Sequence, residues 1–401
     1  MLFSGVGFWA ISPKFMLKYI ILPYLILLSL FRWCSDPLRS VPGPFFAKCT
    51  RLWIILADLS GYRGSIVHKL HKQYGPVVRV SPNELCFAST EALDEIYKAN
   101  SKYTKAPVYE SYAFMGTFNT RDQHQYRTMK RRLNPSFNPR AMEELEPVLR
   151  RQICNLIKCL DKRLETSFDI VPWLRTLSLS VVGEGFIGNS FSGLETEKIP
   201  TLLNEIDEVI PTLWVWWMFP LLSVVLQHSP FPGIRRFMNA ANDFRKYCAS
   251  AYRNYLETKN PQEHHDLIAR MVKEREELRQ KAQPIPRHLT DEGIIDELTN
   301  MIFAGTDTIG NTLIYLFWEL AHHPEWQSRL REELRCVTTD DLNFCPRYGA
   351  VAELPVLDAV LQETFRVHPA GFSGLLRLVP QGGATIAGVY VPPGVSIFWK
   401  E

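Results

Sequence analysis

Residues 289–322 read LTDEGIIDELTNMIFAGTDTIGNTLIYLFWELAH, and this stretch decides the fold class of the protein. Thr290 is a natural N-cap, and the residues after it are mostly apolar as far as His322, where a second histidine and a proline end the pattern. The stretch therefore predicts one long apolar helix that begins after Thr290 and ends at about His322.

The centre of this predicted helix is Ala304-Gly305-Thr306-Asp307-Thr308, small and hydroxyl residues within an otherwise apolar segment. A glycine inside a helix costs about 1 kcal/mol relative to alanine, and threonine side chains compete for backbone carbonyls. We expect Gly305 to let a planar ligand approach the backbone, with the Asp307 acid and the Thr308 hydroxyl beside it. The alternative is a core helix with small residues at a helix crossing.

Most of the remaining chain carries apolar residues at helical spacing. Predicted helices cover 139–164, 170–188, 234–257, 264–283, a stretch from Glu325 onward, and 354–367. Apolar and polar residues alternate over 74–88, which predicts a β-hairpin around a Pro-Asn turn, and the tail over 377–398 returns to a β pattern. The fold class expected from these patterns is mainly α (α+β), with a long central helix and small β-sheets.

Composition indicates a globular protein and excludes some functions. The chain has 401 residues, of which 46% are hydrophobic, and a formal net charge of +3 that is spread evenly. Nucleic acid is therefore not an expected partner. The eight cysteines show neither the short spacings of a zinc site nor the density of a disulfide scaffold, so we expect mostly reduced thiols in a cytosol-facing body.

The N-terminal residues predict a membrane anchor over 1–40. The run Tyr19–Phe31 is apolar and uncharged, and Lys and Arg are more frequent after it than before it, which places the body on the cytosolic side. A cleaved signal peptide is the alternative, although residues 32–36 lack the small side chains of a cleavage site. Val41-Pro42-Gly43-Pro44 forms a stiff turn, so the body is predicted to be one domain over 41–401.

Glu363 and Arg366 stand at i, i+3 on one face of the last predicted helix. Glu276 with Arg279 and Glu332 with Arg335 repeat this spacing in charge-rich helices, but the first pair has apolar neighbours on both sides: Leu357, Val360, Leu361, Phe365 and Val367. We therefore expect Glu363 and Arg366 to be a buried, mutually satisfied pair.

In order and in approximate interval, these motifs resemble the cytochrome P450 family. The segment 304–308 is similar to that family's oxygen-activating helix, Glu363 and Arg366 to its invariant pair, and residues 41–44 to its hinge after the membrane anchor. The segment 134–137, which follows a basic helix, is a further match. The resemblance covers residues 41–395 and implies the cytochrome P450 fold.

The resemblance also implies roles for residues around a haem group. Thr308 would hydrogen-bond dioxygen and Asp307 would help to relay protons to it, while Ala304 and Gly305 would lie against the cofactor. Glu363 and Arg366 would hold the proximal side of the haem pocket as a structural pair. Lys130 or Arg131, together with Arg377, would bind the haem propionates; the alternative for the basic run 130–132 is an ordinary solvated face.

Substrate contacts implied by the resemblance lie in two places. Tyr112, Phe114 and Met115 would belong to a loop over the distal pocket, and Trp217 to an aromatic cluster over 214–219 in a substrate-access region at the lipid surface. Without the resemblance, such a cluster is more often simple core.

The chain departs from the family in one respect. The family's axial cysteine follows in a loop rich in Gly and Arg beyond the late strands, and the chain ends at Glu401 before such a loop, so we expect no metal ligand in this chain. The implied function is a monooxygenase that hydroxylates or epoxidises a lipophilic small molecule of fungal secondary metabolism, such as a terpenoid, alkaloid or polyketide. It would use haem, and NADPH through a cytochrome P450 reductase, on the endoplasmic reticulum membrane. The alternatives are a truncated, inactive relic without thiolate-ligated haem, and an unrelated helical membrane-surface binding protein.

Overall fold

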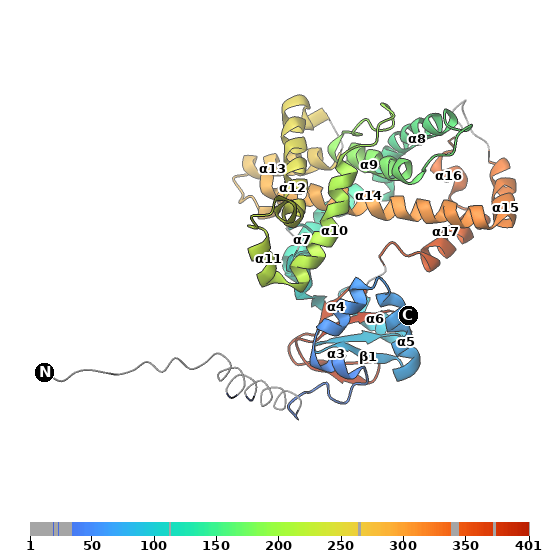
Figure 1. The fold of residues 1–401 in the computed structure, drawn as a ribbon. Helices are drawn as coiled ribbons and strands as arrows, with labels where there is room; N and C mark the ends of the chain where they lie inside the picture. The colour runs from blue at the N-terminus through green and yellow to red at the C-terminus, as the bar shows by residue number, and fades with distance from the viewer. Residues whose placement is uncertain are drawn as a thin grey trace. The chain divides into compact units, whose positions relative to one another are not determined.

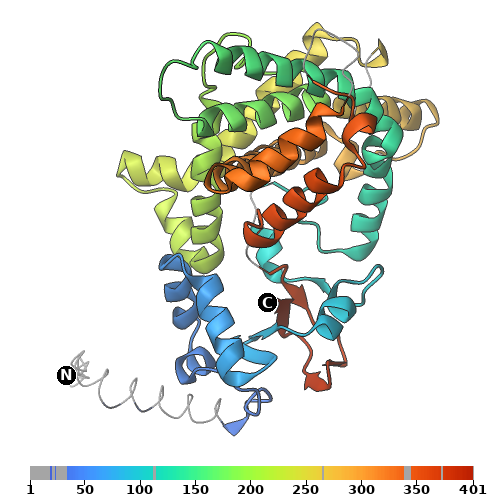
Figure 2. The same ribbon diagram turned by 90° about the vertical axis from the view of Figure 1, so that its right-hand side faces the viewer.

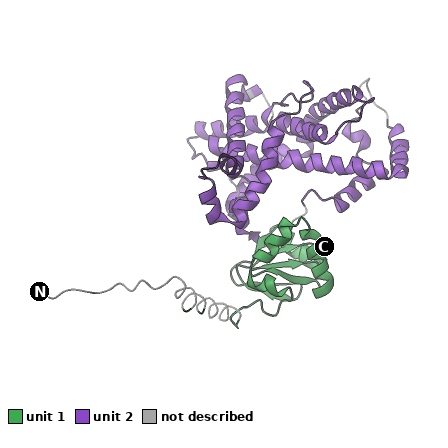
Figure 3. Ribbon diagram, viewed as in Figure 1, with its two compact units in different colours: residues 1–103, 375–401 green, residues 104–374 purple. Residues whose placement is uncertain are grey.

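The computed structural model describes Tyr19, Pro23 and residues 34–111, 114–263, 266–337, 345–371 and 374–400. They divide into two compact units, one formed by residues 1–103 and 375–401 and the other by residues 104–374 (Figure 3). The predicted anchor over 1–40 falls mostly outside the described residues. Among the residues that are described, no helix has both the length and the apolar character needed to cross a membrane. The predicted boundary at residue 41 stays a prediction.

The larger unit, residues 104–374, is helical and is built around one long helix, α14 (Asp291–His322), which crosses α9 (Val171–Ile187) and also contacts α12 and α17 (Figures 1 and 2). The other α-helices of this unit are α7 (Gln123–Leu133), α8 (Pro139–Asp161), α10 (Leu202–Met218), α11 (Pro220–Leu226), α12 (Pro232–Thr258), α13 (Leu267–Gln280), α15 (Pro324–Arg335), α16 (Tyr348–Val351) and α17 (Pro355–Val367). Shorter elements are β3 (Thr104–Lys105), η2 (Pro107–Ser111), η3 (Asn134–Phe137), η4 (Pro261–Glu263) and η5 (Arg287–Leu289).

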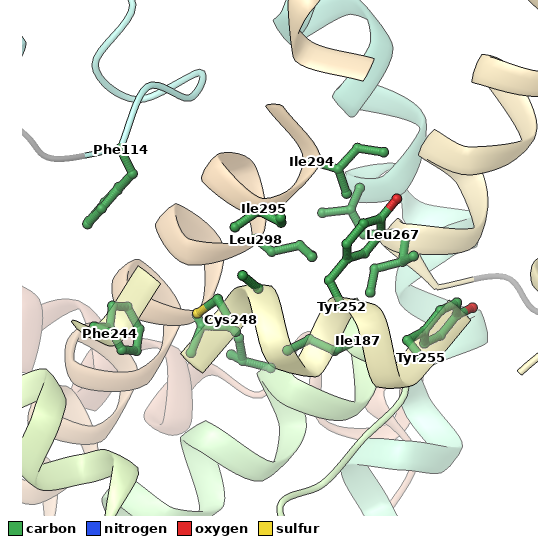
Figure 4. Close-up of a cluster of buried hydrophobic side chains, with 14 of the residues drawn as sticks. Phe114, Ile187, Phe244, Cys248, Tyr252, Tyr255, Leu267, Ile294, Ile295 and Leu298 are labelled. Carbon is green, nitrogen blue, oxygen red and sulfur yellow. The ribbon is translucent and has the colours of Figure 1, made fainter. Parts of the chain in front are cut away.

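Helix α14 begins where the sequence predicts. The Thr290 hydroxyl accepts a hydrogen bond from the Gly293 N–H at 3.2 Å, and Asp291 and Glu292 lie in the first turn, where negative charge is favourable. Apolar side chains of the first three turns enter the core of the unit and pack with residues of α12 and α13, as Figure 4 shows for Ile294, Ile295, Leu298, Phe244, Tyr252 and Leu267. The N-terminal third of α14 is therefore anchored in the core.

The described part of the smaller unit combines four helices with two small sheets. The helices are α3 (Phe45–Cys49), α4 (Leu52–Leu59), α5 (Arg63–Tyr74) and α6 (Thr90–Tyr97). Strands β1 (Val77–Ser81), β2 (Glu84–Phe87), β7 (Ser396–Trp399) and β4 (Arg377–Leu378) lie side by side in that order, and β5 (Ala384–Ile386) pairs with β6 (Val389–Val391). Strands β2 and β7 are parallel, with Glu84 opposite Ser396, so the end of the chain completes a sheet that its beginning starts.

The predicted hairpin over 74–88 is confirmed, since β1 and β2 are antiparallel with Val77 opposite Phe87. Every residue of both strands is buried, the polar ones included. Arg79 is paired with Asp36 and donates to the Pro82 carbonyl at 2.6 Å, while Glu84 accepts from Arg63 at 3.3 Å. Paired charges, rather than solvent, satisfy these polar side chains. The expected fold class, mainly α with small sheets, is confirmed.

Candidate functional site

The middle of α14 presents two of the predicted site residues on an open face. Ala304 and Thr308 are both exposed and stand one turn apart on the same side of the helix. The Thr308 hydroxyl donates to the Ala304 carbonyl at 2.6 Å, whereas the Thr306 hydroxyl is buried and donates to the Ile302 carbonyl at 2.7 Å. Of the two threonines in the motif, only Thr308 can therefore meet a ligand from the open side.

Asp307 points to the flank of the helix, where it is held by Arg175 of α9. The Asp307 Oδ1 atom accepts from Arg175 Nε at 3.1 Å and from Nη2 at 2.8 Å. The same guanidinium donates to both carboxylate oxygens of Asp207 on α10, at 3.2 and 2.5 Å. Burial raises the pKa of Asp307, and the Arg175 charge opposes that shift without cancelling it. The Arg175 guanidinium thus joins three helices. Its partner Asp307 holds a proton more readily than an exposed aspartate does.

Gly305 serves a different purpose from the one predicted. A Cβ atom at this position would lie 2.6 Å from Cγ2 of Val182 on α9, closer than two carbon atoms can approach. Gly310 likewise faces α9, where a Cβ would lie 3.1 Å from Cγ of Arg175. The interpretation that Gly305 admits a planar ligand is corrected: the missing side chain lets α9 and α14 cross closely, as the alternative interpretation of this segment holds.

The predicted propionate-binding residues fall in both units. Lys130 and Arg131 are exposed at the end of α7, with the Lys130 ammonium 5.8 Å from the centre of the Tyr126 ring. Arg132 instead binds inside the helical unit, to Glu274 at 3.0 Å and to His288 at 2.8 Å.

Arg377 lies on β4 of the smaller unit. Its guanidinium stands 5.2 Å from the centre of the Tyr97 ring and donates to the Leu376 carbonyl at 3.2 Å. The role of Lys130, Arg131 and Arg377 in holding propionates stays a prediction.

Glu363 and Arg366 form the predicted pair on α17. Two parallel hydrogen bonds of 2.7 Å join Arg366 Nε and Nη2 to the two carboxylate oxygens, and they lower the pKa of Glu363. The predicted burial is wrong, since the side chains are 61% and 71% exposed. Helix α17 packs on α14 and α15, where Thr364 is buried, while Glu363 borders an open hollow of about 580 Å³ that residues of these three helices line.

The predicted substrate contacts have separate surroundings. Tyr112 lies outside the described residues. Met115 borders a cavity of about 300 Å³ beside α7 and the start of α14, and Trp217 is half-buried on α10.

Phe114 is fully buried in the core of the helical unit, with its ring edge-on to Phe303 at 6.4 Å (Figure 4). Its role as a substrate contact stays a prediction, and in this structure the ring packs beside Phe303.

Comparison with known proteins identifies the family. The sequence model of the cytochrome P450 family matches residues 42–399. The chain belongs to the cytochrome P450 family. It is 26% identical over 389 residues to cytochrome P450 monooxygenase cloA of Claviceps purpurea, covering 93% of this chain and 74% of that one. It is 28% identical over 382 residues to averantin hydroxylase of Aspergillus parasiticus, covering 92% and 73%.

A solved structure supports the fold. Retinoic acid-bound cyanobacterial CYP120A1 superposes with a TM-score of 0.67 at 17% identity, over 90% of this chain and 76% of that one. The family membership also shows that the alternative of an unrelated helical binding protein is wrong.

The haem group of the cytochrome P450 family fits the residues of α14 but not the cysteines of this chain. The open face with Ala304 and Thr308 leaves space for a cofactor. A metal-ligating cysteine has to reach the metal as a thiolate, and Cys86, Cys159, Cys248 and Cys345 are buried among protein atoms. The remaining four, Cys34, Cys49, Cys154 and Cys336, lie in or beside helices or at the chain's beginning, away from any Gly-rich loop.

Sequence reasoning missed Arg175 and Asp207, which hold the acid of the cytochrome P450 motif. A signal was available, because Arg175 and Glu184 are the only charged residues in the segment 171–187. A lone arginine in an apolar helix needs a buried partner, but the partner lies 132 residues further along the chain. Local spacing could not identify Asp307 as that partner.

Proposed function

We propose that this protein is a haem-dependent monooxygenase that hydroxylates or epoxidises a lipophilic small molecule of fungal secondary metabolism. The observation that carries the proposal is the pairing, on α14, of an exposed Thr308 hydroxyl with an adjacent, half-buried Asp307 in a chain of the cytochrome P450 family. The names of the relatives support the reaction type, since one is a monooxygenase and another a hydroxylase.

The residues of α14 would manage protons on the open face. The Thr308 hydroxyl donates to Ala304 but keeps lone pairs, and rotation about its C–O bond lets it donate to an oxygen atom on that face instead. Asp307 would take up a proton when its contact with Arg175 opens, because the Arg175 charge no longer lowers its pKa, and would pass the proton to the open side as the contact re-forms. When bound, the haem group supplies the iron at which dioxygen is activated.

A lipophilic substrate and a membrane location are supported by the surface of the helical unit. Helix α11 and its neighbours expose apolar side chains that no described segment covers: Phe219, Leu221, Leu222, Val224, Val225 and Phe231. Leu221 is 85% exposed. Apolar side chains gathered in this way favour contact with a lipid surface, from which a lipophilic substrate would enter. Anchoring by residues 1–40 at the endoplasmic reticulum and electron supply from NADPH through a reductase belong to the same proposal.

Carbon monoxide difference spectroscopy tests the proposal. The full chain would be expressed with added haem, reduced, and exposed to carbon monoxide. A strongly red-shifted Soret band would establish a thiolate ligand, and serine variants of each cysteine would then identify it. A band typical of histidine-ligated or loosely held haem would overturn the monooxygenase proposal for this chain.

A second candidate is a catalytically inactive member of the family. It is favoured by the burial of four cysteines and by the exposed Glu363–Arg366 pair. Titration with haem distinguishes the candidates further, since the inactive member should show weak absorbance changes that do not depend on Thr308 or Ala304.

A further inference from the structure

One face of helix α8 forms hydrogen bonds with the residues at the start of α16 and just before it. Glu146, Arg150 and Cys154 follow one another at intervals of four and so share one face of the helix. Glu146 Oε1 accepts from the Tyr348 N–H at 3.0 Å, and Arg150 Nε donates to the Cys345 carbonyl at 3.1 Å. Residues 345–348 therefore run along this face, with Cys345 at the end where Cys154 stands.

The two cysteines differ in their access to solvent. Cys154 is half-buried and borders an open cavity of about 490 Å³, together with Arg150 and Arg347. Cys345 is only 6% exposed and does not line this cavity. A small solute can reach the Cys154 sulfur from the cavity, and the Cys345 sulfur can be reached only through its neighbours.

We propose that Cys154 and Cys345 are a redox-sensitive pair that a peroxide converts to a disulfide, which ties the chain before α16 to α8. The proposal is independent of the proposed monooxygenase function. In a reducing compartment, a protein disulfide is usually transient and regulatory rather than structural, and a pair with one accessible thiol and one shielded thiol suits such a role.

The chemistry takes two steps that balance. The Cys154 sulfur attacks the peroxide, an S–O bond forms, the O–O bond breaks and water leaves, so Cys154 becomes a sulfenic acid. The Cys345 sulfur then attacks the Cys154 sulfur; the S–S bond forms, the S–O bond breaks, and the hydroxide leaves as water with the proton of the Cys345 thiol. In total, two thiols and one hydrogen peroxide give one disulfide and two water molecules.

The charges around the pair agree with this order of events. Burial raises the pKa of Cys345, the negative charge of a Cys154 thiolate raises it further, and Arg150 opposes both effects. Cys345 therefore stays a thiol while Cys154 reacts first.

The other buried cysteines have different partners. Cys159, further along α8, donates a hydrogen bond to the Leu194 carbonyl at 3.2 Å. The Cys86 sulfur is hydrogen-bonded to Nε2 of His71 at 3.2 Å. Cys248 packs in the core of the helical unit. Cys154 and Cys345 are thus the pair that peroxide should join.

Mass spectrometry of the full chain in detergent tests the proposal. The protein would be treated with hydrogen peroxide, alkylated, digested and compared with a sample reduced by dithiothreitol. We expect one peptide pair linked through Cys154 and Cys345, loss of two of the eight free thiols, and recovery of both on reduction. Stable sulfinic or sulfonic acid at Cys154 with no linked peptide would overturn the proposal, as would linkage only between molecules.

Variants sharpen the test. Cys154→Ser and Cys345→Ser should each abolish the linked peptide, and Cys154→Ser should leave Cys345 unmodified because the cavity opens onto Cys154. The control is Cys336→Ser, which removes an exposed thiol at the end of α15 and should leave linkage unchanged. If a variant fails to fold, the linked peptide of the unmodified chain still decides the matter. If Cys154 in the Cys345→Ser chain were linked to another cysteine as fully as in the unmodified chain, Cys345 would not be its partner.

Discussion

Two acid–arginine pairs in the helical unit have the same chemistry and opposite surroundings. Arg175 and Asp307 join α9 to α14, and their side chains are 15% and 17% exposed. Glu363 and Arg366 lie one turn apart on α17 and are 61% and 71% exposed. The local pair is visible in the sequence, whereas the pair that closes a helix crossing is not. The comparison shows that spacing predicts a pair within one helix but not a pair between distant helices, and that packing decides whether a pair affects stability.

Removing Arg175 should have the largest effect. Arg175→Met keeps the side-chain volume but leaves Asp307 and Asp207 without their shared cation, so we expect a loss of about 2 kcal/mol, somewhat below the cost of breaking a fully buried pair. Urea unfolding followed by circular dichroism measures this loss. Arg366→Met is the matched control and should leave the midpoint unchanged. Equal losses in the two variants would remove the distinction between the pairs.

Filling the helix crossing should have the next largest effect. Gly305→Ala places a methyl group 2.6 Å from Cγ2 of Val182, so overpacking of about 1–3 kcal/mol should exceed the helix-propensity gain of about 1 kcal/mol. The net expectation is a modest loss of stability that Val182→Ala partly relieves in the double variant.

The control for this crossing is Gly233→Ala. Nothing lies within 4 Å of a Cβ at position 233 of α12, so this variant should keep or slightly raise stability. A stabilising Gly305→Ala would restore the interpretation that the glycine serves a ligand.

The pH dependence that Asp307 gives to the free energy of unfolding should be a smaller effect than the losses expected for the Arg175 and Gly305 variants. Because the pKa of Asp307 is raised in the folded state, the folded protein binds more protons than the unfolded chain between the ordinary and the raised pKa. The contribution of Asp307 is therefore most favourable at low pH and declines as pH rises through that window. Asp307→Asn should gain stability relative to the unmodified protein as pH rises above the ordinary aspartate pKa of about 4, as measured by unfolding midpoints. A variant that instead falls further behind with rising pH would indicate a lowered pKa.

The exposed pair should give the smallest effect. Glu363→Gln removes one charge but can keep a hydrogen bond to Arg366, and both groups are solvated. We expect thermal unfolding of this variant to coincide with that of the unmodified protein at moderate salt. A clear loss would mean that a partner outside the described residues covers α17.

Much of the fold could be predicted because it depends on local patterns. The predicted helices over 139–164, 170–188, 234–257 and 264–283 correspond to α8, α9, α12 and α13 within a few residues. Helix α10 was not predicted, since Pro211 and an aromatic end obscure its period. Helices α4, α5 and α6 were missed because they are short or weakly amphipathic and owe their stability to packing.

The sequence by itself determined the start of α14 at Thr290, the order of the motifs that define the family, the hairpin of β1 and β2, and the pairing of Glu363 with Arg366. Each depends on residues within a few positions of one another. Only the tertiary structure decided that Gly305 makes room for Val182, that Arg175 holds Asp307, that Phe114 is core, and that Glu363 and Arg366 face outward. These features depend on contacts between distant segments, and burial is a property of how helices pack rather than of the spacing along any one of them.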